Sequence, residues 1–325
     1  MDDPEEGRSM RLCLLGCGWA AELHSRTLTQ FRPQIRCSYA SRSLDKARAF
    51  NEKYGGTGAF GAYEEALSSP SVDVVAVLTP PASHLEWALG AIEAGKDVIL
   101  EKPPVLRSSD FDELARACRA HGRFVYVAEN YYYKPVVSKL RAILKAGTIG
   151  EPLFIHLNAV KQQKISGWRE DPAASGGGAL FEGGIHWVNL AGSLGYTIRS
   201  VKASRPGGGA GLERSMLLLI EYAEGPVATL AYSWETASPL KGLRLSRIYG
   251  REGGIVFESN GLVLAASGHR WQLVFPGVRD IQGRKAMFAD FYEAWRGRKE
   301  PQMTLARARR DLEVVEQAYQ SAGVL

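Results

Sequence analysis

A lysine placed between an apolar strand and two prolines is the first group in this sequence that suggests chemistry. The stretch VILEKPPV, residues 98–105, ends its aliphatic run with Glu101, Lys102 and a proline pair. Proline fixes its own φ and restricts the residue before it, so we expect Lys102 to be held extended at the strand tip. A lysine fixed in this way can shuttle a proton. The alternative is an exposed Glu–Lys ion pair, which would contribute little to stability and would not explain the prolines.

A second candidate group lies just after the glycine-rich stretch that begins near residue 176. Glu182, His186 and Asn189 are spaced i, i+4 and i+7, which places them on one face of a helix. A carboxylate beside a histidine can orient the imidazole and raise its basicity. We expect no metal at Glu182 and His186, because no third ligand accompanies them. An isolated histidine usually has a structural role, and we interpret His84, His121 and His156 in this way.

A glycine turn separates the first apolar run, residues 11–16, from the first helical pattern. Its sequence is Gly16-x-Gly18-x-x-Ala21. The first glycine permits a tight turn, the second lets backbone approach a pyrophosphate, and the small third residue lets helix and strand pack closely. The helix that follows offers free N–H groups to phosphates. An ordinary glycine turn is the alternative, but the strand before and the helix after favour a dinucleotide site.

The end of the second expected strand indicates which dinucleotide would bind. An acid at this point would accept a hydrogen bond from the ribose 2′-hydroxyl of NAD, whereas a basic residue accommodates the 2′-phosphate of NADP. The chain has Ser41, Arg42 and Ser43 there, with Lys46 one turn later. Asp45, the nearest acid, fits better in the first turn of the next helix. The alternative is that Arg42 is a solvated loop arginine; the three residues together favour NADP(H).

Alternating strand and helix patterns position these groups in the first part of the chain. Strands are expected at 11–16, 35–40, 72–79, 97–102 and 123–130, and helices at 19–29, 43–54, 83–95 and 108–122. Such alternation predicts a parallel, right-handed α/β sheet of the Rossmann type. Its carboxyl edge is where open α/β sheets bind ligands, and Glu101 and Lys102 fall on that edge.

The pattern changes after a helix expected at 135–146. Strand-like segments joined by short glycine-rich turns then predominate, and two helices follow at about 285–297 and 304–321. This pattern predicts an α+β domain with a mainly antiparallel sheet. We therefore expect a dinucleotide-binding domain at 10–130 and a substrate-binding and oligomerisation domain at 131–325. The C-terminal helix could pack back on the first domain.

Composition limits the classes of protein to consider. At 325 residues the chain is too long for one ordinary core, and 45% hydrophobic and 23% charged residues are typical of a soluble globular protein. The formal net charge is +5, and the run RARR at 307–310 lies in a helical pattern with acids nearby. That arrangement indicates a solvated helix face, so we expect no nucleic-acid partner.

Cysteine spacing and the N-terminal stretch predict the compartment. The four cysteines (Cys13, Cys17, Cys37 and Cys118) lack zinc-like spacing, and three lie in or beside expected strands. They are interpreted as small apolar residues in a reducing compartment. The acidic start MDDPEEGRSM does not resemble a secretion signal, and no apolar run approaches the ~20 residues that span a bilayer. We expect a cytoplasmic protein with no membrane partner.

With these motifs in order, the sequence resembles the glucose–fructose oxidoreductase / inositol dehydrogenase / rhizopine-catabolism (Gfo/Idh/MocA) family of two-domain NAD(P)-dependent oxidoreductases. The segments GCGWAA, TPPASH, EKPP, GTIGEP, GWREDPAASGGGALFEGGIHWVN and DLEVVEQAYQSA cover nearly the whole chain. The resemblance implies a catalytic or substrate-binding role for Lys102 and assigns the family histidine to His186. The expected cofactor-binding residues are Gly16, Cys17, Gly18, Trp19, Ala20, Ser41, Arg42, Thr79, Pro80, His84, Glu101 and Lys102.

Several pocket positions depart from the family pattern. Glu182 stands where the family usually has aspartate, and Asn189 where it often has aspartate. Tyr132 stands where many members carry arginine, which implies a more aromatic pocket that is less suited to an anion. The expected substrate-binding residues are Lys102, Tyr132, Lys161, Trp168, Arg169, Glu182 and His186.

These observations predict an NADP(H)-dependent oxidoreductase that interconverts a secondary alcohol and a ketone on a sugar, sugar derivative or cyclitol. Lys102 and His186 would share the proton transfer, with Glu182 orienting the histidine. A redox-neutral NAD(P)-using glycosidase or epimerase is one alternative. A non-catalytic dinucleotide sensor is another, although such proteins tend to lose the lysine or the histidine. Apolar strands such as LLLIEYA and VATLAYSW predict a homodimer or homotetramer joined through the second sheet, as in many of the resembled relatives.

Overall fold

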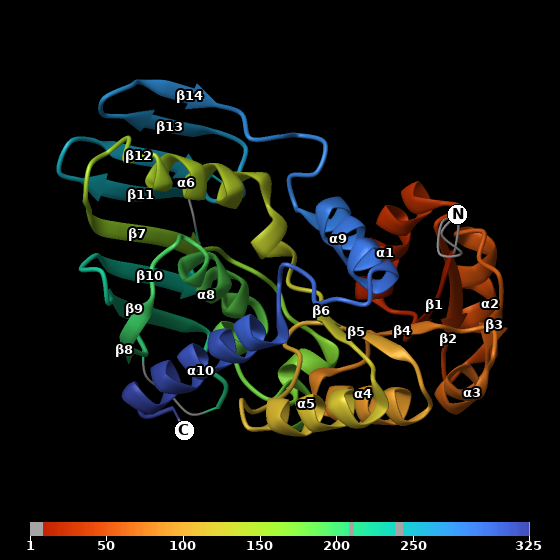
Figure 1. The fold of residues 1–325 in the computed structure, drawn as a ribbon. Coiled ribbons are helices and arrows are strands. Elements are labelled where there is room, and N and C mark those ends of the chain that lie inside the picture. Colours follow the sequence, from red (N-terminus) through yellow and green to blue (C-terminus); the bar gives the residue numbers. More distant parts are fainter. Residues whose placement is uncertain (1–8, 208–210, 238–242, 325) are drawn as a thin grey trace. The chain divides into compact units, whose positions relative to one another are not determined.

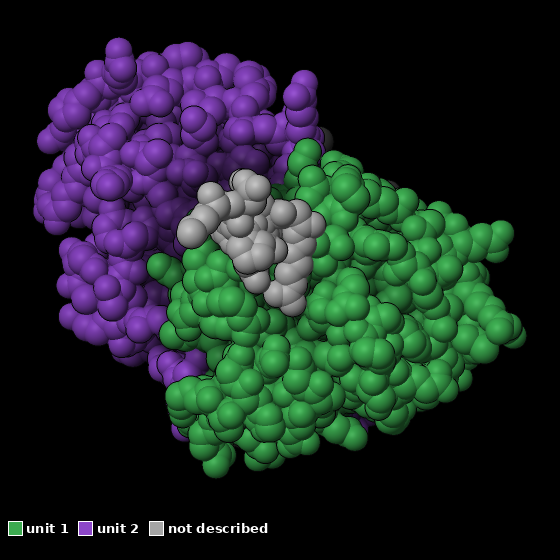
Figure 2. All heavy atoms as spheres, turned by 45° about the vertical axis from the view of Figure 1, so that its right-hand side comes forward, with its two compact units in different colours: residues 1–128, 284–308 green, residues 129–283, 309–325 purple. Residues whose placement is uncertain are grey.

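The computed structural model describes residues 9–207, 211–237 and 243–324 (Figure 1). Most of the acidic N-terminal stretch considered above, residues 1–8, lies outside the described residues. The chain divides into two compact units, shown in green and purple in Figure 2. Unit 1 contains residues 1–128 and 284–308, and unit 2 contains residues 129–283 and 309–325. Within the described part of the chain, no helix is long and apolar enough to cross a membrane.

Unit 1 is built on a parallel sheet of six strands in the order β3-β2-β1-β4-β5-β6. The strands are β1 (Met10–Leu15), β2 (Ile35–Ala40), β3 (Ala59–Phe60), β4 (Val74–Val77), β5 (Asp97–Leu100) and β6 (Val125–Val127). Every residue of β4, β5 and β6 is buried, because helices cover both faces of the sheet. The structure confirms the expected Rossmann-type sheet, and it adds the short strand β3, which the sequence pattern did not indicate.

Helices of unit 1 pack on its sheet, and all those named below except α9, which comes from later in the chain, connect the parallel strands. They are α1 (Trp19–Leu28), α2 (Leu44–Lys53), α3 (Tyr63–Ser68), α4 (His84–Glu93), α5 (Asp110–His121) and α9 (Arg284–Arg296). Helices α4 and α5 lie on one side of the sheet, and α1 and α9 on the other (Figure 1). Ser43 caps α2, as expected, by accepting a hydrogen bond from the Lys46 N–H. Helix α9 lies in unit 1, which differs from the 131–325 domain proposed from the sequence.

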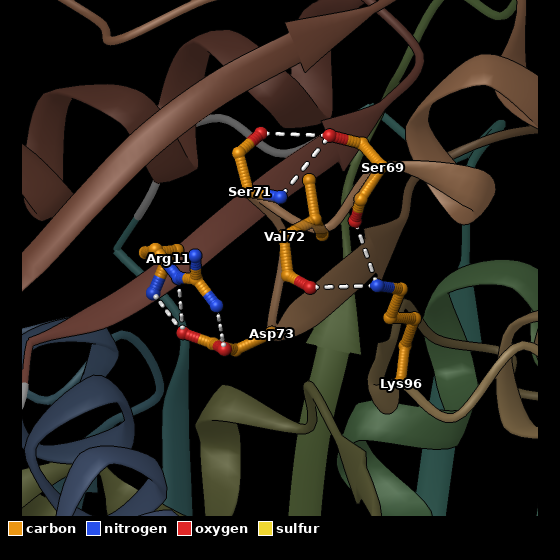
Figure 3. A network of polar contacts seen from close by, with 6 residues as sticks. All are labelled: Arg11, Ser69, Ser71, Val72, Asp73 and Lys96. Carbon is orange, nitrogen blue, oxygen red and sulfur yellow. Dashed lines mark hydrogen bonds and ion pairs between the residues drawn. The ribbon is translucent and has the colours of Figure 1, made fainter.

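A network of charged side chains stabilises the amino edge of the unit 1 sheet (Figure 3). Arg11 on β1 donates two side-chain hydrogen bonds to the carboxylate of Asp73, just before β4. Lys96, just before β5, donates to the carbonyls of Ser69 and Val72 at 2.8 and 2.9 Å. Burial lowers the pKa of Lys96. This edge therefore serves structure, and the opposite edge carries the candidate ligand-binding residues.

Unit 2 is built on a mainly antiparallel sheet of eight strands in the order β14-β13-β12-β11-β7-β10-β9-β8. The strands are β7 (Pro152–Val160), β8 (Ile198–Ser204), β9 (Ser215–Tyr222), β10 (Val227–Ser233), β11 (Leu245–Gly250), β12 (Gly254–Glu258), β13 (Leu264–Ser267) and β14 (Gln272–Val274). Only the β7–β10 pair is parallel among the strand pairs in the described part of this sheet. The structure thus confirms the expected antiparallel second domain.

Helices accompany this sheet in unit 2, and at least one of them contacts one face of it. They include α6 (Pro135–Lys145), the short α7 (Pro172–Ser175), a π-helix (Leu180–Gly184) and α8 (Ile185–Gly192), which continues from it. Tyr222 on β9 donates to the carbonyl of Ala191 on α8 at 3.1 Å. Helix α10 (Leu305–Ser321) contains the boundary between the two units. The alternation of buried and exposed residues along β9 leaves the other face of the sheet exposed.

Candidate active site

The glycine turn of unit 1 has the backbone geometry that a dinucleotide site requires. Gly16 adopts a φ of 107°, and a Cβ at this residue would lie 3.0 Å from the carbonyl oxygen of Leu78. Only glycine fits this position without strain. A Cβ at Gly18, by contrast, would meet no atom within 4 Å. Gly18 precedes α1, so the first N–H groups of the helix and the open space above Gly18 can receive a phosphate.

The loop after β2 places basic side chains near this turn. Arg42 and Lys46 are exposed, and Ser41 is buried, with its hydroxyl accepting a hydrogen bond from the Ser43 N–H. Lys46 is close enough to Cys17 in the glycine turn to lower the pKa of that thiol, although burial dominates and raises it to about 11. Asp45 is exposed at the start of α2, as expected. A nucleotide at the glycine turn would therefore meet positive charge at the end of β2.

Lys102 lies directly after β5 at the carboxyl edge of the sheet. Its side chain is partly exposed, and the Lys102–Pro103 peptide bond is cis. The preceding residue, Glu101, accepts a hydrogen bond from Nε2 of His24 on α1 at 2.7 Å. His24 is not among the residues expected from the sequence. Chemically, this arrangement presents an ammonium group beside the place where α/β sheets bind their ligands.

His84 is fully buried at the start of α4. Its Nδ1 lies 2.8 Å from the carbonyl oxygen of Pro103, and its Nε2 lies 2.8 Å from the carbonyl oxygen of Thr79. Both ring nitrogens thus contact backbone. Thr79 itself accepts a hydrogen bond from the hydroxyl of Ser83. These contacts indicate a structural role for His84 rather than direct contact with a cofactor.

In unit 2, the catalytic histidine expected from the sequence is oriented by a glutamate. His186 Nδ1 lies 2.6 Å from Oε1 of Glu129, which is 2% exposed. The same oxygen accepts a hydrogen bond from the Tyr131 N–H at 2.9 Å, and the Tyr131 ring stacks on the imidazole with centroids 4.4 Å apart. Donation from Nδ1–H to the carboxylate makes Nε2 the ring nitrogen with the lone pair, which is the arrangement of a general base.

Glu182 lies in the π-helix and interacts with an arginine. Its Oε1 accepts a hydrogen bond from Nε of Arg169 at 3.1 Å, and both side chains are largely buried. The Arg169 guanidinium lies 4.4 Å from the ring centroid of Trp168. Burial and the nearby Glu182 charge raise the pKa of Tyr232 well above its usual value, so that hydroxyl is neutral. The structure therefore brings together Trp168, Arg169 and Glu182, three of the expected substrate-binding residues.

A cavity of about 350 Å³ opens beside these residues in unit 2. It is lined by Gln162, Gln163, Lys164, Ile165, Glu170, Arg214, Trp234 and Glu235. Trp234 donates its indole N–H to the hydroxyl of Tyr232, which packs against the π-helix. Glu170 adjoins Arg169 in the chain, and Trp234 lies close to Gly183 of the π-helix, so the cavity lies near the Arg169–Glu182 pair. The lining offers hydrogen-bond donors and acceptors on several sides.

Comparison with known proteins places the chain in a family. The model for the oxidoreductase family with an NAD-binding Rossmann fold matches residues 10–129, and the GFO/IDH/MocA C-terminal domain model matches residues 137–256. The chain belongs to the GFO/IDH/MocA family. An uncharacterized oxidoreductase of Rhizobium meliloti is 34% identical over 160 residues, which are 47% of this chain and 46% of that protein. The D-glucoside 3-dehydrogenase of Escherichia coli is 27% identical over 185 residues, 56% of this chain and 53% of that protein.

The match therefore spans about half the length of these two GFO/IDH/MocA relatives. Solved structures extend the likeness in fold to the whole chain. A levoglucosan dehydrogenase in complex with NADH and levoglucosan has a TM-score of 0.87 at 20% identity, with 98% of each chain covered. At this identity, the likeness establishes the shared fold.

The departures from the GFO/IDH/MocA pattern have visible partners in the structure. Asn189 donates to the carboxylate of Asp311 on α10 at 2.7 Å, and both side chains are buried. A carboxylate is thus present beside this position even though residue 189 is an amide. Tyr132 is 7% exposed, and the Arg141 guanidinium lies 4.7 Å from its ring centroid. Lys161 follows β7, and its N–H donates to the carbonyl of Ser233.

Glu129, like His24, is a residue of the candidate site that was not predicted from the sequence. The expected pairing of His186 with Glu182, four residues away, assumed a regular α-helix. The π-helix at 180–184 widens the turn in which Glu182 lies. Glu129 comes directly after the buried segment VYVA, residues 125–128, and a charged residue at that point was the available signal. Among the described residues, no three His, Cys, Asp or Glu side chains are grouped to hold a metal ion.

Proposed function

We propose that this protein is an NADP(H)-dependent oxidoreductase that interconverts a secondary alcohol and a ketone on a sugar, sugar derivative or cyclitol. The observation that carries the proposal is the orientation of His186 by the buried Glu129 at 2.6 Å. Such a pair holds a proton acceptor ready in a chain that also has a dinucleotide-type glycine turn. The glycine geometry at Gly16 and Gly18 fits the cofactor, and a nicotinamide bound there would accept or donate the hydride.

The residues of this chain would bind the substrate and move its proton. As the alcohol is oxidised, its hydroxyl proton must leave while the adjacent carbon loses hydride. In the proposal, Lys102 and His186 share that proton transfer, with Nε2 of His186 as the acceptor and Glu129 stabilising the charged imidazole. Arg169 and Glu182 would hold substrate hydroxyl groups, because a guanidinium donates and a carboxylate accepts. Glu182 remains a candidate orienting group for His186.

A sugar-like substrate is supported by the chemistry of the cavity in unit 2. Amide, carboxylate and guanidinium groups beside an indole suit a ligand with many hydroxyl groups. Relatives named as a D-glucoside 3-dehydrogenase and a levoglucosan dehydrogenase support the same class. A panel of free sugars, alkyl glucosides, levoglucosan and cyclitols, followed at the nicotinamide absorbance, tests the proposal. Turnover without net change in the cofactor would instead indicate a redox-neutral glycosidase or epimerase.

NADP(H) should bind at least about ten-fold more tightly than NAD(H), equivalent to ~1.4 kcal/mol, because Arg42 and Lys46 can contact the 2′-phosphate. Fluorescence titration of the wild type and Arg42→Ala with NADPH and NADH measures this preference. Arg42→Ala should lose most of it, whereas Arg48→Ala, an exposed arginine in the helix that follows, should retain it. Equal affinities of the wild type for both cofactors would contradict the assignment.

The exposed face of the unit 2 sheet should join two or more copies of the chain. One row across this face, aligned by the strand register, contains Leu219, Thr229, His156, Arg247, Val256, Ala265 and Leu273. Phe154, Leu217, Leu219 and Leu273 on the same face are between 39% and 54% exposed. An exposed apolar surface of this kind is typical of a subunit interface. We therefore propose a homodimer or homotetramer.

Light scattering at micromolar concentration should give a multiple of the 35.6 kDa chain mass. Leu219→Glu should shift the mass toward the monomer, because it places a charge in the apolar face. Leu262→Glu introduces the same charge at an exposed turn leucine and should leave the mass unchanged. A wild-type protein that is strictly monomeric at this concentration would refute the interface.

A reducing compartment, and hence a cytoplasmic location, completes the proposal. All four cysteines are free thiols, and Cys13 and Cys37 are buried in β1 and β2. Burial raises the pKa of Cys13 and of Cys37 to about 12, which keeps both as unreactive thiols.

A further inference from the structure

Two loops at the carboxyl edge of the unit 1 sheet are tied together by one side chain. The first loop follows β4 and contains Thr79; the second follows β5 and contains Lys102 and Pro103. His84 contacts the carbonyl oxygen of Thr79 through Nε2 and that of Pro103 through Nδ1, each at 2.8 Å. The ring is fully buried, so these two carbonyls are its principal polar environment.

Both atoms that face the imidazole of His84 are hydrogen-bond acceptors. A neutral imidazole has one N–H and can satisfy only one carbonyl, whereas the doubly protonated ring satisfies both. Burial lowers the pKa of His84, and its carbonyl contacts and the carboxylate of Glu101 act in the opposite direction. Because burial dominates, the pKa of His84 is lowered and the neutral ring is favoured. The neutral ring donates to one carbonyl at a time, while each of its two nitrogens lies 2.8 Å from a carbonyl oxygen of one loop.

The residue on the other side of Lys102 is held by a second histidine. Glu101 accepts a hydrogen bond from His24 Nε2 at 2.7 Å, and the His24 ring packs edge-on against Phe288 of α9 with centroids 5.3 Å apart. His24 is 7% exposed. The residues before and after Lys102 are therefore each fixed by a buried histidine, one on α1 and one on α4.

The Thr79 loop also touches the glycine turn. The carbonyl oxygen of Leu78 lies 3.0 Å, and the Thr79 nitrogen 3.7 Å, from the position of a Cβ at Gly16. A displacement of Thr79 would therefore disturb the backbone proposed to receive the cofactor phosphates. His84 thus links the proposed cofactor-binding turn to the proposed catalytic lysine.

We propose that His84 and His24 are positioning residues that fix Lys102 from both sides, and that His84 also couples Lys102 to the cofactor-binding turn. This inference rests on the proposed catalytic role of Lys102. Neither histidine needs to touch the substrate or the cofactor. Each acts through a neighbour of Lys102, and His84 acts through Thr79 as well.

Asparagine and glutamine can separate the two contacts of His84. The amide nitrogen of asparagine can occupy the place of Nδ1, and that of glutamine the place of Nε2, so each variant can keep one donor and lose the other. His84→Gln should lose the Pro103 contact and slow single-turnover hydride transfer about 10- to 100-fold, since a displacement of about 1 Å can have such an effect. Its NADPH affinity should stay within about two-fold of wild type, because the Thr79 contact is kept.

His84→Asn should show the reverse pattern. Loss of the Thr79 contact should weaken NADPH binding about three- to ten-fold, the range of one lost hydrogen bond, with hydride transfer closer to wild type than in His84→Gln. Ile92→Ala, at a fully buried residue of the same helix, is the matched control for destabilisation. It should lower the melting temperature and leave both functional quantities near wild type.

Coupling to Lys102 is measured by adding His84→Gln to Lys102→Met. If His84 acts through Lys102, the second change should slow hydride transfer by less than about two-fold. Should the His84 variants fail to fold, His24→Asn and His24→Gln provide the same test, because only glutamine can keep the donor to Glu101. His24→Asn should then be the slower enzyme of that pair.

The inference is overturned if His84→Gln and His84→Asn change turnover and affinity in equal proportion, or if His84→Gln is fully additive with Lys102→Met. Failure of the proposed function gives a different result. In that case the wild type would transfer no hydride with any substrate of the panel. NADPH titration and a crystal structure of His84→Gln would then still show whether the Thr79 and Lys102 loops depend on this ring.

Discussion

Lys102→Met should slow hydride transfer by roughly 10²–10⁴-fold, the usual loss for an acid–base group. Methionine keeps much of the bulk of the lysine side chain and removes its ammonium group. Lys102 lies at the carboxyl edge of the sheet, where its neighbours are held by His24 and His84. The measurement is single-turnover hydride transfer at the nicotinamide absorbance, with whichever sugar or cyclitol the panel identifies.

NADP(H) affinity is the internal control for Lys102→Met. It should change much less than the rate, because the backbone of Gly16 and Gly18 is untouched. The matched control variant is Lys96→Met, at the opposite edge of the same sheet, where the ammonium bonds only backbone carbonyls in the described network. Lys96→Met should lower stability and preserve the rate. Hydride transfer at the wild-type rate in Lys102→Met would show that Lys102 is only structural.

His186→Ala should also slow hydride transfer by about 10²-fold or more, because it removes the proposed proton acceptor. Glu129→Gln keeps the shape of the side chain and removes the charge that stabilises the imidazolium, so a loss of about 10-fold or more is expected. Glu129→Gln combined with His186→Ala should be little slower than His186→Ala alone, since Glu129 acts through the histidine. The same single-turnover assay measures all three variants.

Glu182→Gln separates the two candidate orienting groups of His186. If Glu182 mainly holds substrate together with Arg169, its loss should raise KM and should not be masked by His186→Ala. Two results together would instead identify Glu182 as the orienting group. Glu129→Gln would have wild-type turnover, and Glu182→Gln would be strongly impaired in the presence of His186 but cause no further loss when added to His186→Ala. The double variant Lys102→Met/His186→Ala should fall short of the product of its single defects if both residues serve one proton path.

The parts of the fold that depend on local pattern could be predicted from the sequence. The β-branched run before the helix at His84 correctly indicated a buried strand of the first unit. The cap at Ser43 correctly indicated the start of a helix. Short-range sterics and burial determine both features. The two-residue strand β3 and the six-residue helix α3 are too short for a periodic signal. The local sequence of helix α9 does not indicate which of the two units the helix belongs to.

The contacts within the candidate site depend on residues far apart in the chain. His186 and Glu129 are 57 residues apart, and His24 and Glu101 are 77 apart, so no spacing rule connects them. The π-helix that displaces Glu182 from regular α-helical spacing is also invisible in sequence, since five residues do not distinguish the two periods. The sequence could therefore name Lys102 and His186 as chemical groups but not the side chains that orient them.

The most direct test follows a labelled hydrogen. The protein is incubated with NADP⁺ and substrates from the panel that carry deuterium on the carbinol carbons, and the nicotinamide is examined by nuclear magnetic resonance. The account predicts that NADPH accumulates with deuterium at the reduced ring carbon for at least one sugar, glycoside or cyclitol, and that Lys102→Met suppresses this transfer. Tight NADPH binding without deuterium transfer from any of them would contradict the account and favour a dinucleotide sensor.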